Sequence, residues 1–296
     1  AARGLIERVS HRRGPRYGKA VLAVGIYERQ LPRLDAELER DMRQYAAEAF
    51  GAALHQARTP QMRTVPVHAS IPLPLGVAPF EDIRVFVKQS PGPFAAMSCI
   101  CRHGKDLLGE PCRQTNLRET CLTFETAADS MVEAGAARYI TREQVLQILD
   151  AADREGLVLQ PQNTAAPLFL CCCCGCCCHV LQTARQLPQP SRVFSTSYRA
   201  RVDAARCEAC GTCLTRCQMD AIVVEGDLAR VTEPRCIGCG LCVTTCPSGA
   251  MSLTRLPELR LPPRDTPALY TKIFIERFGR FAAAAALAKH VVGAKV

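Results

Sequence analysis

The sequence predicts an α+β protein built from more than one module. Three observations lead to this prediction: cysteines that repeat with a fixed period over residues 207–246, helical spacing of apolar residues in the middle of the chain, and two short alternating runs near its start. The 296 residues exceed the usual length of one domain, and 48% of them are hydrophobic, which is enough to form sizeable cores.

Residues 1–30 are predicted to form a hairpin of two short strands. Apolar and polar residues alternate over 5–10 and again over 17–24, and a basic turn separates the two runs. This partial hairpin resembles the wing of a winged-helix domain. The helices that precede such a wing are absent from this sequence, so either a longer protein was cut or the resemblance is accidental. Attraction to phosphate alone carries no base readout, and we do not expect this chain to bind nucleic acid.

Residues 31–190 are predicted to form an α-rich module that contains many cysteines. Apolar residues at helical spacing indicate a long amphipathic helix from about residue 32 to 56. A proline-rich linker at 66–79 follows it, and a second helix over 80–87 stops before Pro91, because the residue before a proline disfavours helical geometry.

A third helix is indicated by signals at both of its ends. Thr141 is suited to cap its first turn, Gln144 completes a capping box, and Gly156 ends it. The apolar stripe expected to be buried contains Val145, Ile148, Leu149 and Ala152.

The strongest signal is a set of four cysteines with the spacing C-x2-C-x2-C-x3-C that occurs twice, 29 residues apart. Three thiolates two residues apart can wrap around one face of a four-iron cubane, while the fourth belongs to the other cluster. The spacing therefore predicts one [4Fe–4S] cluster held by Cys207, Cys210, Cys213 and Cys246. It predicts a second one held by Cys236, Cys239, Cys242 and Cys217.

Residues 200–256 resemble the bacterial two-[4Fe–4S] ferredoxin family, and the domain is predicted to span 198–256. The resemblance rests on the repeated cysteines and on Pro247, whereas Gln218 replaces the proline that would follow the first copy. It implies a ferredoxin-like two-cluster C-terminal domain. Zinc and disulfides are the alternatives, but a four-thiolate zinc site leaves the third cysteine of each copy unexplained, and disulfides need an oxidising compartment.

We expect a cytoplasmic protein. The N-terminal residues lack the features of a secretion signal, and no stretch approaches the roughly 20 apolar residues of a membrane span, 281–288 being the longest candidate. The formal net charge of +9 overstates the positive charge. Each bound cubane carries about −2 because its thiols are deprotonated, so two clusters would leave about +5 and a third about +3.

A second group of cysteines, eleven in number, lies outside the repeat. It includes a C-x-C-R segment at 99–102 and the run CCCCGCCCH at 171–179. This density exceeds what core packing needs and indicates a metal site. The arrangement resembles a group of larger bacterial and archaeal iron–sulfur proteins that combine a C-x-C-R segment, a cysteine-rich patch and a C-terminal two-cluster domain.

The ligands of this third site are expected among seven cysteines. Neighbouring side chains of an extended segment point to opposite sides, so the cysteines of the run cannot all hold one cubane. The candidates are Cys99, Cys101, Cys112, Cys171, Cys173, Cys174 and Cys177. We expect an iron–sulfur centre rather than zinc, with unligated or redox-switching thiols as the alternative. His103 and His179 are expected beside ligands or at the surface rather than among the ligands, and Arg102 either neutralises cluster charge or is solvated.

Residues 257–296 are predicted to form a proline-rich tether and a C-terminal helix. Phe274, Phe278 and Phe281 fall on one helical face. Three phenylalanines make a sufficient buried stripe, so we expect them to pack against the protein itself rather than against a partner or a membrane surface.

These features together predict electron transfer. Two [4Fe–4S] clusters and a third iron–sulfur centre would pass single electrons to a redox protein or an oxidoreductase complex. Two alternatives stay open: a redox-sensing DNA-associated regulator, and an iron–sulfur reductase acting at the Cys171–Cys178 patch. Dinucleotide-binding, Walker A and nucleophile-elbow motifs are absent from the sequence. We therefore expect an electron-transfer protein or a redox-complex subunit rather than a stand-alone enzyme, and predict no catalytic residue.

Overall fold

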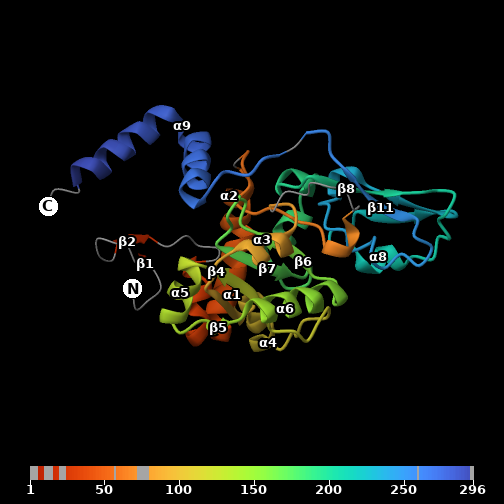
Figure 1. Cartoon of the computed structure of the whole chain (residues 1–296), viewed down its shortest axis with the longest axis horizontal. Coiled ribbons are helices and arrows are strands. Elements are labelled where there is room, and N and C mark those ends of the chain that lie inside the picture. The colour runs from red at the N-terminus through yellow and green to blue at the C-terminus, as the bar shows by residue number, and fades with distance from the viewer. Residues whose placement is uncertain are drawn as a thin grey trace.

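The computed structural model mixes helices and strands, in agreement with the predicted α+β class. It describes residues 6–9, 16–19, 25–56, 58–71, 80–258 and 260–293. In this part of the chain one five-stranded sheet lies among helices, and three two-stranded sheets lie outside it (Figure 1).

The five-stranded sheet is antiparallel throughout and has the strand order β5-β3-β4-β7-β6. Its strands are β3 Phe94–Ser98, β4 Glu119–Phe124, β5 Arg138–Ile140, β6 Val158–Pro161 and β7 Phe169–Cys173. The prediction of an α-rich middle module missed this sheet. β4 and β6 are buried on both faces, so their sequences lack the alternation of apolar and polar residues that signals a strand.

The long helix predicted over 32–56 is present as three successive helical segments, and the first of them begins at Ala36. Asp35 caps α1 (Ala36–Tyr45) by accepting a hydrogen bond from the Leu38 amide at 2.8 Å, which sets the first helical residue at Ala36. A π-helical turn (Ala46–Phe50) and α2 (Gly51–His55) continue the run.

The other helices of this module are short, apart from α6. They are α3 Ile83–Gln89, α4 Ile100–Leu107, α5 Thr126–Glu133, α6 Arg142–Arg154 and α7 His179–Arg185. The predicted capping box of α6 is present, because Thr141 and Gln144 exchange hydrogen bonds between side chain and backbone. α3 and α6 contribute to the main core, whereas Met131 of α5 packs with Cys121 in a separate cluster.

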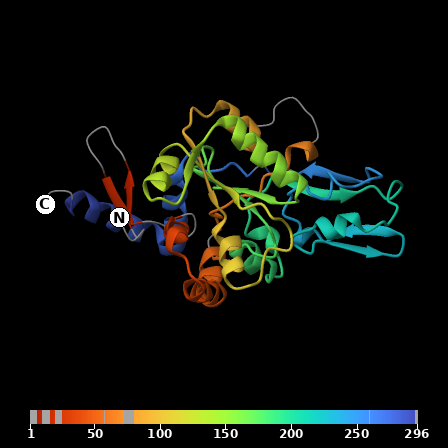
Figure 2. The same ribbon diagram turned by 90° about the horizontal axis from the view of Figure 1, so that it is seen from below.

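The repeated cysteines lie in a separate lobe at one end of the molecule (Figure 2). Two antiparallel pairs frame them: β8 (Tyr198–Val202) with β11 (Met251–Arg255), and β9 (Ile222–Glu225) with β10 (Leu228–Val231). The short helix α8 (Thr212–Arg216) joins the first cysteines to the fourth.

The N-terminal hairpin is present as two paired strands. β1 (Ile6–Val9) and β2 (Arg16–Lys19) are antiparallel, as the sequence predicts. The intervening turn and residues 20–24 lie outside the described residues, and the resemblance to a wing stays a prediction.

The C-terminal helix α9 (Thr266–Gly293) bends at Gly279 and extends away from the rest of the molecule (Figure 1). Its first turns dock through Leu269, which is fully buried, and through Glu276, which accepts two hydrogen bonds from Thr59. The prediction that the phenylalanines pack against the protein is wrong, since Phe278 is 59% and Phe281 94% exposed. The docked face is formed by other residues. Within the described residues no helix is long and apolar enough to cross a membrane.

Candidate metal centres

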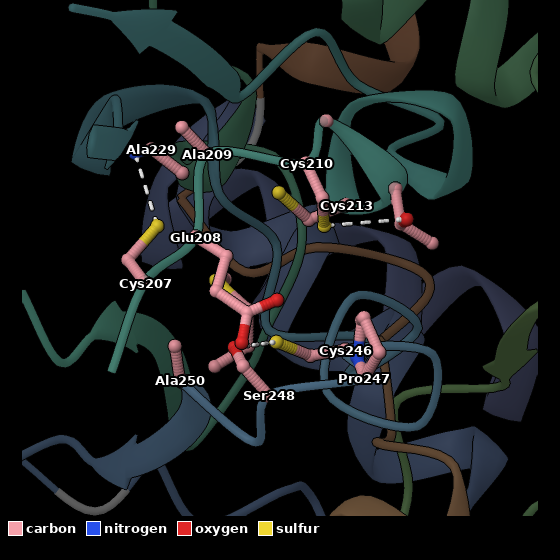
Figure 3. Close-up of a pocket in the computed structure, with 13 residues that line it drawn as sticks. Cys207, Glu208, Ala209, Cys210, Cys213, Ala229, Cys246, Pro247, Ser248 and Ala250 are labelled. Carbon is pink, nitrogen blue, oxygen red and sulfur yellow. Dashed lines mark hydrogen bonds between the residues drawn. The ribbon is translucent and has the colours of Figure 1, made fainter. Parts of the chain in front are cut away.

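One group of repeated cysteines lines a single pocket. Its lining includes Cys207, Cys210, Cys213 and Cys246 (Figure 3). The loop can wrap around this space because Ala209 and Gly211 have left-handed backbone angles, with φ values of 51° and 73°. We call this the outer site, because the Cys210 side chain is exposed.

The other four cysteines of the repeat line a second pocket. Cys217, Cys236, Cys239 and Cys242 line it, and we call it the inner site because Cys236 and Cys242 are buried. Each site thus takes three cysteines from one copy of the repeat and the fourth from the other. These are the two groups of four that the spacing predicts.

Backbone amides are directed at sulfur atoms in both sites. The amide of Ala229 donates to Cys207 Sγ at 3.4 Å, and the amide of Ala221 donates to Cys217 Sγ at 3.2 Å. The Ala200 amide donates to Cys236 Sγ at 3.4 Å. Hydrogen bonds of this kind stabilise ligating thiolates and help to set the potential of an iron–sulfur cluster. Spaces bordered by four thiols and by amides that point at sulfur fit the expected cofactor.

The thiols of the two sites differ in acidity. Burial raises the pKa of Cys239 to about 12 and the pKa of Cys242 well above its ordinary value. Hydrogen bonds from the hydroxyl and the amide of Thr212 instead lower the pKa of Cys210 in the outer site. Burial favours the protonated thiols at the inner site, whereas metal ligation requires thiolates. Binding at this site must therefore release protons from the sulfur atoms.

Equivalent residues of the two copies of the repeat have left-handed backbone angles, but different atoms surround them. Ala209 corresponds to Gly238, which also has a positive φ of 69°. A Cβ atom at Gly238 would lie 2.2 Å from the carbonyl oxygen of Tyr198 in β8. The inner copy therefore requires glycine where the outer copy tolerates alanine.

Residues 200–253 match the family model described as a 4Fe-4S dicluster domain. The match runs from β8 to β11 and contains all eight repeated cysteines. This part of the chain is therefore an iron–sulfur domain of ferredoxin type, which indicates iron–sulfur electron transfer. The comparisons with curated proteins and with solved structures found no match.

A third group of cysteines lies outside this domain. The sulfur atoms of Cys112, Cys174, Cys176 and Cys177 all lie within 4.8 Å of one another, and we call them the four-cysteine group. Cys112 Sγ is 3.6 Å from both Cys174 Sγ and Cys176 Sγ. A tetrahedral ion with metal–sulfur bonds of about 2.3 Å has sulfur atoms roughly 3.8 Å apart. The spacing fits one metal ion better than a cubane, whose four irons would hold the sulfurs further apart.

The structure divides the seven cysteines predicted for the third site. Cys112, Cys174 and Cys177 belong to the four-cysteine group, while Cys99, Cys101, Cys171 and Cys173 lie outside it. Cys176 was missed. The signal for it was Gly175, which interrupts the run of cysteines. The chain turns at this glycine directly after β7, and the turn brings Cys174, Cys176 and Cys177 together. Within the extended strand, by contrast, neighbouring side chains alternate as expected.

Arg102 lies inside the protein, next to the cysteines. Its side chain is fully buried and donates to the carbonyl oxygens of Cys172 at 2.6 Å and Leu117 at 3.4 Å, and to the Thr120 hydroxyl. The alternative of a solvated arginine is therefore excluded. The structure agrees with the other alternative, in which the guanidinium offsets negative charge on thiolates.

His179 is also buried, directly after the cysteine run. Its ring stacks on Tyr27 with the ring centres 5.5 Å apart, and its Nε2 lies 3.4 Å from Glu39 Oε1. The Tyr27 hydroxyl donates to Glu39 at 2.5 Å. The ring is therefore not at the surface, and its expected place beside ligands rather than among them stays a prediction. His103 is half-buried.

Proposed function

We propose that this chain transfers single electrons through two [4Fe–4S] clusters and a third metal–thiolate centre, and that it serves a redox protein or an oxidoreductase complex. The observation that carries the proposal is the pair of four-cysteine spaces in the dicluster domain, each completed by a cysteine from the other copy. The cofactors would supply the one-electron chemistry. The proposed ligands are Cys207, Cys210, Cys213 and Cys246 at the outer site, and Cys217, Cys236, Cys239 and Cys242 at the inner site.

The burial of the two sites supports an order for the electron path. Cys210 is exposed and Leu214, one residue after Cys213, is 38% exposed, so a partner can approach the outer site closely. The inner site is shielded and faces the middle of the chain, where the Val67 amide donates to the Cys239 carbonyl at 3.0 Å. We propose that electrons are exchanged with the partner at the outer site.

The third centre is proposed at the four-cysteine group rather than at the wider set expected from the sequence. Its support is the sulfur spacing and the contact of Gln218, next to Cys217, with Gly175 in the four-cysteine turn. A single iron held by four thiolates can exchange one electron, whereas zinc has no redox chemistry and would make this centre structural. The proposed modules are 31–190, which contains this centre, and 198–256, which contains the clusters.

Counting delivered electrons tests the electron-transfer proposal. The anaerobic protein would be reduced, freed of excess reductant and mixed with oxidised cytochrome c as an artificial acceptor. Each cubane delivers one electron. We expect the unchanged chain to reduce at least two equivalents of acceptor. Replacing Cys210 and Cys239 together by serine should remove these two electrons, while Cys172→Ser, outside both sites, should not. An unchanged electron count in the double variant would defeat the proposal.

Metal analysis tests the third centre separately. The Cys112→Ser/Cys176→Ser double variant should lose one metal ion per chain and keep the EPR signals of both ferredoxin clusters. The lost ion identifies the centre as iron or zinc. Retention of every metal ion in this variant would remove the four-cysteine group from the proposal without affecting the two clusters.

A further inference from the structure

Six of the cysteines outside the repeat form an assembly of their own, which we call the thiol row. Neighbouring thiols along the row interact with one another through their side chains. In spatial order the row contains Cys121, Cys171, Cys173, Cys178, Cys101 and Cys99. None of these six belongs to the four-cysteine group.

The sheet builds one end of the row. Cys171 and Cys173 lie two residues apart in β7, so their side chains are on the same face of the sheet. Cys121 in β4 lies directly opposite Cys171 in the antiparallel pairing. Cys172 points to the other face, where it is 1% exposed.

Two helix starts build the other end. Cys178 is the last residue before α7, and Cys99 is the last residue before α4, whose second residue is Cys101. Short helices thus direct three thiols toward those of the sheet. Four separate elements contribute to the row, and such convergence of one reactive side-chain type has no packing rationale.

We propose that the thiol row binds a polynuclear iron–sulfur cluster, separate from the four-cysteine group and additional to the third centre proposed above. The shape of the row supports a cluster rather than a single ion. Among the described residues, which include all six cysteines of the row, the four-cysteine group alone brings three or more potential ligand atoms within 4.8 Å of one another. One ion cannot collect a tetrahedral set from a row, whereas several irons bridged by sulfide reach thiols that are further apart.

The surroundings of the row support an enclosed ligand. Cys121 is 5% exposed, and Cys173 and Cys178 are 6% exposed. Cys99, Cys101 and Cys171 are half-buried.

The positive charge of Arg102 supports metal-bound thiolates in both the thiol row and the four-cysteine group. The three hydrogen bonds of this buried guanidinium go to neutral oxygens, and its Nε has no partner in the structure. Among the thiols, it interacts with Cys99 and Cys173 of the row and with Cys174 of the four-cysteine group. A buried cation without a carboxylate partner is costly, and metal-bound thiolates on both sides provide its counter-charge.

The test compares two changes in the same strand. Cys171→Ser/Cys173→Ser removes two thiols of the row, and Cys172→Ser is the matched control, because it changes the buried cysteine between them on the opposite face. Full-length proteins would be purified anaerobically and analysed for iron, zinc and acid-labile sulfide. We expect the double variant to lose at least two irons together with sulfide, to keep the ferredoxin EPR signals, and to keep the metal that Cys112→Ser/Cys176→Ser removes. The control should lose none.

Metal and sulfide in the unchanged protein provide a second readout that does not depend on the folding of a variant. Two cubanes and one ion account for at most nine irons and eight sulfides per chain. The proposal requires more than nine irons and more than eight sulfides per chain. Both counts refer to chains in which the two ferredoxin clusters are complete. Eight sulfides or fewer would overturn it, and so would a double variant whose metal content equals that of Cys172→Ser. Loss of the same metal in both double variants would show one centre in place of two, with the ferredoxin clusters unaffected.

Discussion

The side-chain oxygen of Gln218 accepts a hydrogen bond from the backbone amide of Gly175 at 2.8 Å. Gln218 directly follows Cys217 of the inner site, and Gly175 lies in the turn of the four-cysteine group. The same side chain donates from Nε2 to the Gly156 carbonyl at 3.2 Å. A proline at this position, as the ferredoxin pattern prefers, would make neither bond. The departure from that pattern therefore occurs where the dicluster domain contacts the rest of the chain.

Replacing Gln218 by methionine should destabilise this contact. The substitution keeps the side-chain length but leaves the Gly175 amide and the Gly156 carbonyl without partners, at a cost of about 1–3 kcal/mol for each buried unsatisfied group. A cost of 1 kcal/mol lowers the melting temperature of a domain of about 60–100 residues, the size class of the dicluster domain, by roughly 4–8 °C. We expect a decrease of several degrees in the temperature at which the visible iron–sulfur absorbance is lost. The exposed Gln186→Met variant is the control. Equal midpoints for both variants would contradict the proposed contact.

Two glycines at equivalent positions of the repeat should respond differently to alanine. Gly211 and Gly240 have φ values of 73° and 75°, so alanine costs about 1–2 kcal/mol of backbone strain at either position. A Cβ atom at Gly211 would meet no atom within 4 Å, whereas at Gly240 it would lie 1.9 Å from Ser70 Oγ. We expect Gly211→Ala to keep both clusters with a small loss of stability. Gly240→Ala should lose stability and, in addition, lose the inner cluster.

Iron content and EPR signals of the two variants distinguish these outcomes. Loss of one cluster from Gly240→Ala alone would support the close approach of Ser70 to the inner loop. Equal iron contents in the two variants would show that Ser70 can move away and that the backbone angle alone decides the effect.

The grouping of the repeated cysteines could be predicted from the sequence because it depends on local spacing. Each loop holds its first three cysteines within seven residues, and the fourth position follows a rule of the motif. The members of the four-cysteine group could not be predicted in the same way. Cys112 reaches the group from a distant loop, and whether Cys176 joins depends on a turn that begins where β7 ends.

The five-stranded sheet was missed by the prediction because both of its faces are buried. The α6 helix was predicted correctly because its caps and its apolar stripe are local signals. The central sheet was missed because helices cover it, and alternation of apolar and polar residues requires one face in water. The phenylalanine stripe of α9 was misassigned because spacing shows that residues share a face but not which face is covered.

The Cys112 thiol should be unusually acidic when no metal is bound. A hydrogen bond from the Cys174 thiol lowers the pKa of Cys112 to about 6. Because the pKa is lowered, the reactive thiolate predominates above about pH 6. The alkylation rate should therefore level off near pH 7, whereas the rate of an ordinary thiol, with a pKa of about 8.5, rises to about pH 9. Cys174→Ala removes the hydrogen bond and should shift the profile of Cys112 toward that of an ordinary thiol.

Mass spectrometry can follow this one thiol. After chelation, the protein would be pulsed with iodoacetamide at each pH and digested with trypsin. The peptide 106–113 contains Cys112 and no other cysteine. A profile that rises to pH 9 in the unchanged protein would contradict the hydrogen bond between the two thiols.

Leu269 and Phe281 should differ sharply in their effect on α9, although both are large apolar residues of one helix. Leu269 is fully buried, and its neighbour Tyr270 accepts a hydrogen bond from Gln61 at 2.5 Å. Truncating a buried leucine to alanine costs about 2–5 kcal/mol. Phe281 is 94% exposed, so Phe281→Ser should change stability by no more than about 0.5 kcal/mol.

Limited tryptic cleavage after Lys272 and Arg277 measures how often α9 detaches, because cleavage follows the population of the open form when opening is fast. A cost of 2 kcal/mol corresponds to an increase of roughly 25-fold in that population. Leu269→Ala should therefore be cleaved at least roughly 25 times faster than the unchanged chain, and Phe281→Ser at the unchanged rate. If Phe281→Ser were cleaved as fast as Leu269→Ala, the exposed aromatic face would also hold the helix in place, and docking through Leu269 would not account for its attachment.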